Sequence, residues 1–340
     1  MFPGFANVWT PVAPSSLLRP GRPLALRVAG TPVVLFRDGD GRPAALVDRC
    51  PHRGVALSLG RVTGGRLECP FHGWQFDGRG HNCAVPWNPD AKLARLGAVA
   101  LPARELAGQV WVFTGEVAEG EPGVEATFLR DDVRLCGFVL ELATHWTRAM
   151  ENMLDWPHLP FVHAGTIGKP MRGSASGRMD ITLDERPWGF RSRIAIDGRP
   201  QPGALDYRFP NRMNLFVPVP DKTLAMEVSC VPVDDRRTRL VMMTARDFAK
   251  AALLDPLFNR QNRKIAGEDR VVVESSQPAA VPPPAEERSV RTDEPTLYFR
   301  RRYFADLRGS EASVAPAGAR PVALRRKPGA DERPALDRSA

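Results

Sequence analysis

Residues 50–74 read CPHRGVALSLGRVTGGRLECPFHGW and carry two short Cys/His motifs. Cys50-x-His52 is followed by sixteen residues and then by Cys69-x-x-His72, so each motif offers one thiolate and one imidazole. Two Cys and two His can hold one zinc ion in a tetrahedron, but zinc fingers pair Cys with Cys and His with His. The interleaved order favours a two-iron cluster, in which one iron takes both cysteines and the other takes both histidines.

This segment resembles the Rieske motif, and residues 69–74, CPFHGW, match the second loop of that family residue for residue. The resemblance implies a [2Fe–2S] Rieske cluster bound by Cys50, His52, Cys69 and His72. Two imidazoles in place of two thiolates raise the reduction potential from about −400 mV to roughly −150 to +300 mV. The alternative is a zinc site, or four residues without a shared role.

Length and composition indicate a globular chain with more than one domain. The 340 residues are 43% hydrophobic and 25% charged, which is ordinary for a soluble protein. We expect no membrane segment, because no run of eighteen apolar residues occurs, and no signal peptide, because the N-terminus lacks a basic segment before an apolar one. Five cysteines at wide spacings form no disulfide framework. We therefore expect a cytoplasmic protein.

The formal net charge of +8 does not predict nucleic-acid binding. The positive charge is spread, and no basic stripe interleaved with aromatic residues occurs. The basic runs at residues 300–302 and 325–327 are expected to be solvated faces. The alternative is a basic surface that steers an acidic electron-donor protein into contact.

Residues 1–115 are predicted to form an antiparallel β domain with the Cys/His loops at its tip. Short alternating segments are separated by turn residues such as Asp38-Gly39-Asp40-Gly41. Residues 116–136 are acidic and contain Gly and Pro, which indicates a linker. Residues 310–340 are rich in Ala, Pro and Arg without periodicity, which indicates a disordered tail.

Residues 137–309 are predicted to form a second, catalytic domain of the α+β class. A helix at 147–155 precedes a strand-rich middle, and a longer helix follows at about 255–276. The family resemblance implies a helix-grip-like catalytic domain here. An apolar pocket is expected among side chains of the strand-rich middle that serve equally well as core: Met213, Leu215, Phe216, Met226 and Met242.

The second informative stretch is 150–163, MENMLDWPHLPFVH. Its prolines break helix regularity, so His158 and His163 are able to converge from a helix end and the turn after it. Two histidines and one carboxylate form the facial triad of non-haem Fe(II) oxygenases. Alone, two histidines five residues apart are more often ordinary packing. Beside a Rieske motif, Asp155-x-x-His158-x4-His163 resembles the mononuclear iron motif of Rieske non-haem iron oxygenases.

Asp269 is the candidate third ligand. On a helix it shares a face with Ile265, Val272 and Val273, and a carboxylate on a buried face is costly unless it is paired or metal-bound. The Glu-Asp pair before Val-Val-Val-Glu also resembles the C-terminal ligand segment of the family. Glu268 is the fallback ligand, and a surface salt bridge for Asp269 is the alternative.

The family resemblance also implies roles for Asp155 and Asn152. The acidic residue at the position of Asp155 bridges a cluster histidine of one subunit, here His72, to an iron histidine of the next, here His158. This role implies an oligomer, expected to be a head-to-tail homotrimer. Asn152 occupies a position where some family members keep an Asn close to the iron.

The two motifs resemble those of terminal oxygenase alpha subunits in the monooxygenase and O-demethylase-like group. The resemblance implies that O₂ and electrons from NAD(P)H are used to hydroxylate or oxidatively demethylate a mostly apolar cyclic molecule, in natural-product biosynthesis or aromatic catabolism. No G-x-G-x-x-G fingerprint follows a strand, so a separate reductase, with or without a ferredoxin, is expected. The alternatives are an electron carrier or redox sensor that uses only the cluster, and a module that binds apolar ligands.

Overall fold

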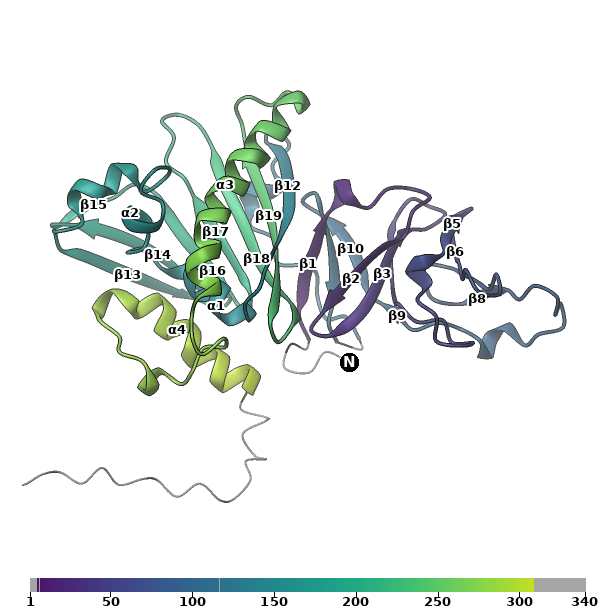
Figure 1. The fold of residues 1–340 in the computed structure, drawn as a ribbon. Coiled ribbons are helices and arrows are strands. Elements are labelled where there is room, and N and C mark those ends of the chain that lie inside the picture. Colours follow the sequence, from purple (N-terminus) through teal and green to yellow (C-terminus); the bar gives the residue numbers. More distant parts are fainter. Residues whose placement is uncertain (1–4, 6, 116, 309–340) are drawn as a thin grey trace, which may run out of the picture.

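The computed structural model describes residues 5, 7–115 and 117–308, and these form two parts side by side (Figure 1). The first is built only of strands and short 3-10 turns, and the second is a large sheet covered by helices. This order confirms the predicted α+β fold class. The predicted disordered tail, 310–340, lies outside the described residues. No helix in the described ranges is long and apolar enough to cross a membrane.

The N-terminal part consists of three antiparallel sheets, with strand orders β1-β11-β10, β2-β3-β4-β9 and β5-β6-β7-β8. Their strands are β1 (Trp9–Pro14), β2 (Leu24–Val28), β3 (Thr31–Arg37), β4 (Pro43–Val47), β5 (Arg61–Thr63), β6 (Arg66–Glu68), β7 (Gln75–Phe76), β8 (Asn82–Ala84), β9 (Ala100–Leu101), β10 (Ala103–Leu106) and β11 (Gln109–Phe113). The first two sheets share a core of β-branched and aliphatic side chains, among them Val33, Leu35 and Val110, all fully buried. The third sheet carries the Cys/His loops at the end far from the second part (Figure 1).

The second part is built on an eight-stranded antiparallel sheet. The main order is β12-β19-β18-β17-β16-β14-β13, and β15 pairs with β14. Its strands are β12 (Arg134–Leu142), β13 (Met179–Arg186), β14 (Gly189–Ile196), β15 (Arg199–Pro200), β16 (Ala204–Arg208), β17 (Arg212–Phe216), β18 (Leu224–Asp234) and β19 (Arg237–Arg246). The segment predicted as a linker, 116–136, overlaps this sheet, because its last three residues already belong to β12.

Helices cover one face of this sheet. They are α1 (Trp146–Leu154), α2 (Leu159–Val162), α3 (Asp255–Glu274) and α4 (Glu294–Arg302), with the 3-10 segment η5 (Lys169–Ser174) between α2 and β13. The long helix α3 crosses the sheet beside α1 and β12 (Figure 1). Both predicted helices, 147–155 and 255–276, are therefore present with ends shifted by one or two residues.

The buried face of α3 differs from the predicted one. Its buried residues are Asn262, Ala266, Asp269 and Val273, which follow the spacing of one helix face. Val272, predicted to share the buried face with Asp269, is 49% exposed. Asp269 itself is buried as expected, with an exposed fraction of 4%. The buried stripe is thus more polar than the sequence suggested, and a carboxylate lies in the middle of it.

His145 forms the N-terminal cap of α1, the helix that leads into the segment with Asp155, His158 and His163. Its Nδ1 accepts a hydrogen bond from the backbone N–H of Thr147 at 3.4 Å and lies 2.7 Å from the Thr147 hydroxyl oxygen. Burial lowers the pKa of His145 to about 4, and weaker effects of Asp235 and Arg308 oppose each other. Only the neutral ring can accept the capping bond.

The stability of the protein is therefore expected to fall as the pH drops from about 6.5 to about 4. In the unfolded chain His145 gains its proton near pH ~6.5, whereas in the folded chain it does so only near pH 4, so protons favour unfolding in this window. His145→Asn keeps a good N-cap acceptor that does not titrate. Urea unfolding at pH 7 and pH 5 should show a larger loss for the wild type than for the variant. Equal losses would show that His145 does not titrate in this window.

Candidate metal centres

The two Cys/His loops have the same backbone hydrogen-bonding pattern. The N–H of Cys50 donates to the carbonyl of Val55 at 2.8 Å, and the N–H of Gly54 donates to the carbonyl of Cys50 at 2.9 Å. In the second loop the N–H of Cys69 donates to the carbonyl of Trp74 at 2.8 Å, and that of Gly73 donates to the carbonyl of Cys69 at 3.0 Å. The two loops thus form turns with equivalent backbone structure.

A glycine closes each of these turns because the backbone there is left-handed. Gly54 has φ of 75° and Gly73 has φ of 71°, a region that other residues rarely adopt. A Cβ on Gly73 would lie 3.1 Å from the Cγ of Pro86, so the segment around Pro86 packs directly over the second loop.

The four predicted cluster residues fall into a sulfur pair and a nitrogen pair. Cys50 and Cys69 are buried, with 2% exposure each, and burial together with the neighbouring Cys69 raises the pKa of the Cys50 thiol to about 11. The His52 and His72 rings lie 4.6 Å apart between centroids, and His52 stacks on Trp74. Nδ1 of His52 is buried and has no hydrogen-bond partner.

This arrangement fits a two-iron cluster better than a single zinc ion. A tetrahedral zinc site requires four ligand atoms that converge on one point. Within the described residues, only one group of three or more Cys, His, Asp or Glu ligand atoms converges in this way, and it contains none of these four residues. Paired buried thiols and an orphaned imidazole nitrogen are what a cluster with two sulfur and two nitrogen ligands requires.

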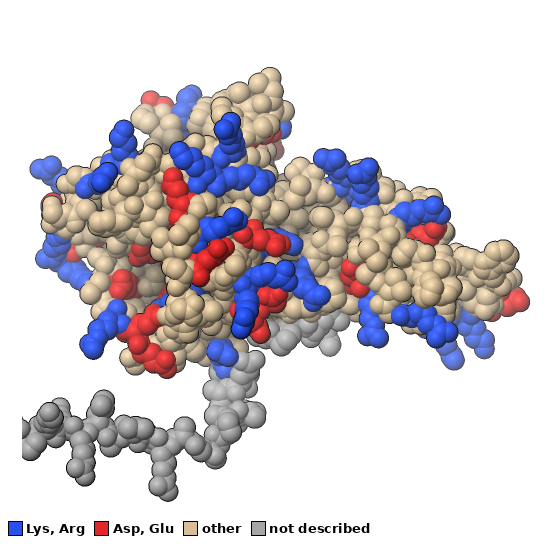
Figure 2. All heavy atoms as spheres, viewed as in Figure 1, with Lys and Arg blue, Asp and Glu red and all other residues tan. Residues whose placement is uncertain are grey.

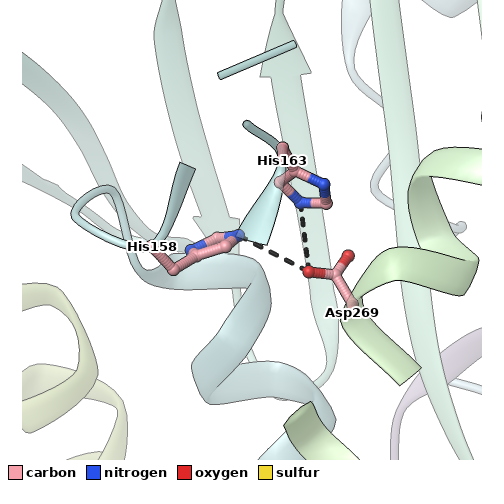
Figure 3. Close-up of side chains that lie close together, drawn as sticks. All are labelled: His158, His163 and Asp269. Carbon is pink, nitrogen blue, oxygen red and sulfur yellow. Dashed lines mark ion pairs between the residues drawn. The ribbon is translucent and has the colours of Figure 1, made fainter. Parts of the chain in front are cut away.

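The converging group is the predicted triad His158, His163 and Asp269. Nε2 of His163 lies 3.1 Å from Oδ1 of Asp269, and Nε2 of His158 lies 3.6 Å from the same oxygen (Figure 3). All three ligand atoms lie within 4.8 Å of one another. His158 precedes and His163 follows the four-residue helix α2, whereas Asp269 comes from α3. The short helix is what brings two histidines five residues apart to one point.

A metal cation fits this group. Asp269 is buried, and its Oδ1 has no hydrogen-bond partner although it faces two imidazole nitrogens. A buried carboxylate without such a partner is costly unless a cation balances it. Two imidazoles and one carboxylate also form the ligand set of the facial triad, which leaves coordination positions open.

A second carboxylate orients each histidine. Oδ2 of Asp155 lies 3.1 Å from Nδ1 of His158, and Oε2 of Glu268 lies 2.8 Å from Nδ1 of His163. Thr166 donates its hydroxyl to the same Glu268 oxygen at 2.7 Å. Such outer contacts fix the tautomer and the ring orientation of a metal-binding histidine. Both Nε2 atoms are thereby directed toward Asp269.

These contacts separate the two candidate third ligands. Glu268 contacts Nδ1 of His163, whereas Asp269 contacts Nε2, the other ring nitrogen. Only Asp269 belongs to the converging group. Burial alone would lower the pKa of His163, but the nearby carboxylates of Asp269 and Glu268 raise it above its usual value. The sequence did not predict the orienting roles of Glu268 and Thr166, because they depend on how α3 is rotated against α2.

A cavity of about 310 Å³ opens beside the triad. Asn152 and Asp155 line it at the metal end, and Nδ2 of Asn152 is buried without a hydrogen-bond partner. The five side chains named from the sequence as pocket or core candidates all line it, together with further apolar residues: Met153, Trp156, Leu159, Ile167, Met171, Ile194, Leu205, Val217, Val228, Leu240 and Ile265. The lining away from the triad is thus largely apolar.

Two protein-family models match the chain. The Rieske [2Fe-2S] domain matches residues 8–96, and the vanillate O-demethylase oxygenase C-terminal domain matches residues 205–305. The first range includes both Cys/His loops, and the second includes Asp269.

Curated relatives extend the similarity over most of the chain. Chlorophyllide a oxygenase of Chlamydomonas reinhardtii is 29% identical over 294 residues, which cover 81% of this chain and 44% of that protein. Methylxanthine N1-demethylase NdmA of Pseudomonas putida is 29% identical over 306 residues, which cover 85% of this chain and 82% of that protein. The chain therefore spans less than half of the length of the first relative.

The solved structure of Pseudomonas putida CBB5 NdmA superposes with a TM-score of 0.73 at 25% sequence identity. The superposition covers 90% of this chain and 92% of that chain. It includes both parts of the fold, so the two-part architecture is shared.

Proposed function

The chain belongs to the Rieske non-haem iron oxygenases, and from this premise we propose that it is a terminal oxygenase component. It takes electrons that originate from NAD(P)H through a separate reductase, with or without a ferredoxin. With O₂ it hydroxylates an apolar cyclic small molecule, or demethylates it when the hydroxylated carbon is a methyl on oxygen or nitrogen. One oxygen atom enters the substrate and the other leaves as water, with two electrons and two protons consumed.

The proposed ligands follow from the two clusters of side chains. Cys50, Cys69, His52 and His72 bind the [2Fe–2S] cluster, and His158, His163 and Asp269 bind Fe(II). When bound, the cluster supplies single electrons and the mononuclear iron supplies O₂ activation. The chain itself contributes orientation and exclusion of water: Asp155 and Glu268 hold the imidazoles, and the apolar cavity wall surrounds the substrate.

One observation carries this proposal beyond an electron carrier. Two imidazole nitrogens and an unpartnered carboxylate oxygen converge at the edge of an apolar cavity large enough for a small molecule. An electron carrier or a redox sensor requires the cluster but neither the triad nor the cavity. A module that only binds apolar ligands requires the cavity but not the triad.

We further propose that electrons cross between copies of the chain in a head-to-tail homotrimer. The Cys/His loops and the triad lie in opposite halves of one chain (Figure 1). Phe71 and Trp87 are exposed beside His72 at the tip, and Phe161 is exposed on α2 beside the triad, which suits mutual burial between copies. Asp155, which lines the metal end of the cavity, then bridges His158 to His72 of the next copy.

The surface charge supports a small-molecule substrate rather than nucleic acid. On the face drawn in Figure 2, Lys and Arg are dispersed, and Asp and Glu lie among them over the catalytic half. A nucleic-acid site would gather basic side chains into a patch or stripe. All five cysteines are free thiols, which supports our proposal of a reducing, cytoplasmic location.

The test is to measure iron and acid-labile sulfide on anaerobically purified protein, together with the EPR spectrum of the reduced form. About three irons and two sulfides per chain with a Rieske-type spectrum are expected. Substrate-dependent O₂ consumption with a reductase should follow. If the protein kept only about two irons per chain after Fe(II) reconstitution, with the same spectrum, the oxygenase proposal would be rejected in favour of an electron carrier.

A further inference from the structure

The cavity beside the triad has an unusual distribution of charge. Its ionisable lining residues all belong to the candidate metal centre: His158, His163, Asp155 and Asp269. No Lys or Arg lines it within the described part of the chain. With Fe(II) bound, two neutral imidazoles and two carboxylates leave the centre close to neutral. The cavity therefore offers no positive charge for an anionic substrate.

The basic residues nearest to the lining are engaged elsewhere or exposed. The guanidinium of Arg191 lies over the ring of Phe216 at 4.9 Å, but it makes two hydrogen bonds, of 2.6 and 2.8 Å, to the buried carboxylate of Asp206. Lys169 and Arg172 of η5 flank lining residues and are themselves exposed. A carboxylate in the cavity would thus be buried without a cationic partner, which costs free energy or favours its protonation.

Gln201 is the one polar lining side chain outside the metal end of the cavity. It lies in the loop between β15 and β16, where its backbone N–H donates to the carbonyl of Ile194 at 2.9 Å. Its Nε2 donates to the carbonyl of Arg199 at 3.1 Å, and its Oε1 accepts no hydrogen bond from the described residues. One N–H and the amide oxygen thus stay available to a ligand.

We propose that this cavity selects an uncharged cyclic substrate that carries a carbonyl group, anchored by the amide of Gln201, and rejects the carboxylate with the same skeleton. This inference rests on the proposed function and names its substrate class. An amide that borders an otherwise apolar cavity favours a neutral carbonyl over a carboxylate, because the carbonyl accepts its N–H without bringing in a charge that no lining cation balances. The volume of about 310 Å³ suits one ring or two fused rings.

The test uses pairs of ligands with nearly the same shape and different charge. The pairs are 4-methoxybenzamide with 4-methoxybenzoate, and 6-methoxy-2-naphthamide with 6-methoxy-2-naphthoate. Dissociation constants are measured by calorimetry on iron-loaded protein, without O₂ and without reductase, so that no turnover occurs. At least one amide is expected to bind about tenfold or more tightly than its acid, a difference of about 1.4 kcal/mol.

Three variants locate the origin of this preference. Gln201→Leu should weaken binding of the amide without improving binding of the acid. Gln201→Lys places a cation at the same position and should reverse the preference within each pair. Met226→Leu, an apolar exchange in the same cavity, is the matched control and should leave the ratio unchanged. Because Gln201 is half-buried in a loop, the two Gln201 variants should keep the iron content of the wild type.

The outcomes separate this inference from the proposed function. Equal or tighter binding of the acids to wild-type protein, absence of binding of both amides, or an unchanged ratio in Gln201→Lys would each overturn it. The protein could show the predicted binding preference and yet lack the third iron or consume no O₂. The proposed ligand class would then be supported, and the proposed oxygenase function would be rejected.

Discussion

Asp269→Asn is expected to reduce the iron content from about three to about two per chain and to abolish substrate oxidation. The exchange keeps the shape of the side chain and removes the negative charge that faces both imidazoles. An amide is a poor ligand for Fe(II) in a triad that provides only one anionic group. The sulfide content and the EPR signal of the cluster should stay unchanged, because the cluster loops lie in the other half of the chain.

Glu268→Gln is the matched variant on the same helix. Its carboxylate holds the outer nitrogen of His163 and does not converge with the triad, so metal binding should weaken about 10–100-fold without being lost. Titration of the metal-free protein with Co(II), followed by absorption, measures both affinities. If Glu268→Gln removed the iron while Asp269→Asn retained it, the assignment of the third ligand would be reversed.

The second large effect is recovery of activity in mixed oligomers. His72→Ala removes a proposed cluster ligand and Asp269→Asn a proposed iron ligand, so each variant alone should be inactive. Co-expressed in one oligomer, an intact cluster of one chain can lie next to an intact iron of its neighbour. Each mixed head-to-tail trimer contains one such junction among its three, so purified mixed trimers should show about a third of the wild-type activity per chain.

Two affinity tags, one on each variant, allow only mixed oligomers to be purified for this measurement. If electrons passed within a single chain, every mixed oligomer would stay inactive, since no chain has both centres. Persistent inactivity of verified mixtures would therefore contradict transfer between copies. A monomeric protein in solution would do so as well.

The cluster loops were predictable because all four residues and their turn glycines lie within 25 consecutive positions. A local motif fixes local geometry, and the two loops indeed share one hydrogen-bonding pattern. His158 and His163 were predictable for the same reason. The third residue, Asp269, comes from another helix. It was predicted from its place on a buried helix face, and that face was predicted only in part, because Val272, expected to be buried, is exposed.

Other features required the tertiary structure. The segment 204–208 has no strand or helix pattern, since the charged Asp206 lies at its centre. In the structure Asp206 is buried in β16, and its pairing with Arg191 compensates its charge. Methionines such as Met226 are apolar whether they fill a core or line a cavity, so the sequence left both open. The Asp197-Gly198 turn before Gln201 is a local hairpin signal, but that this hairpin borders the cavity is visible only in the tertiary structure.

The contact between His163 and Glu268 joins positions 105 residues apart. A metal ion held between α2 and α3 closes a loop of similar length, and in this respect it acts as a reversible crosslink. Crosslinks of long loops restrict the unfolded chain most, and a ligand that binds only the folded state adds stability in proportion to the logarithm of its concentration. We therefore expect iron supply to affect how long each molecule survives proteolysis, in addition to how fast it works.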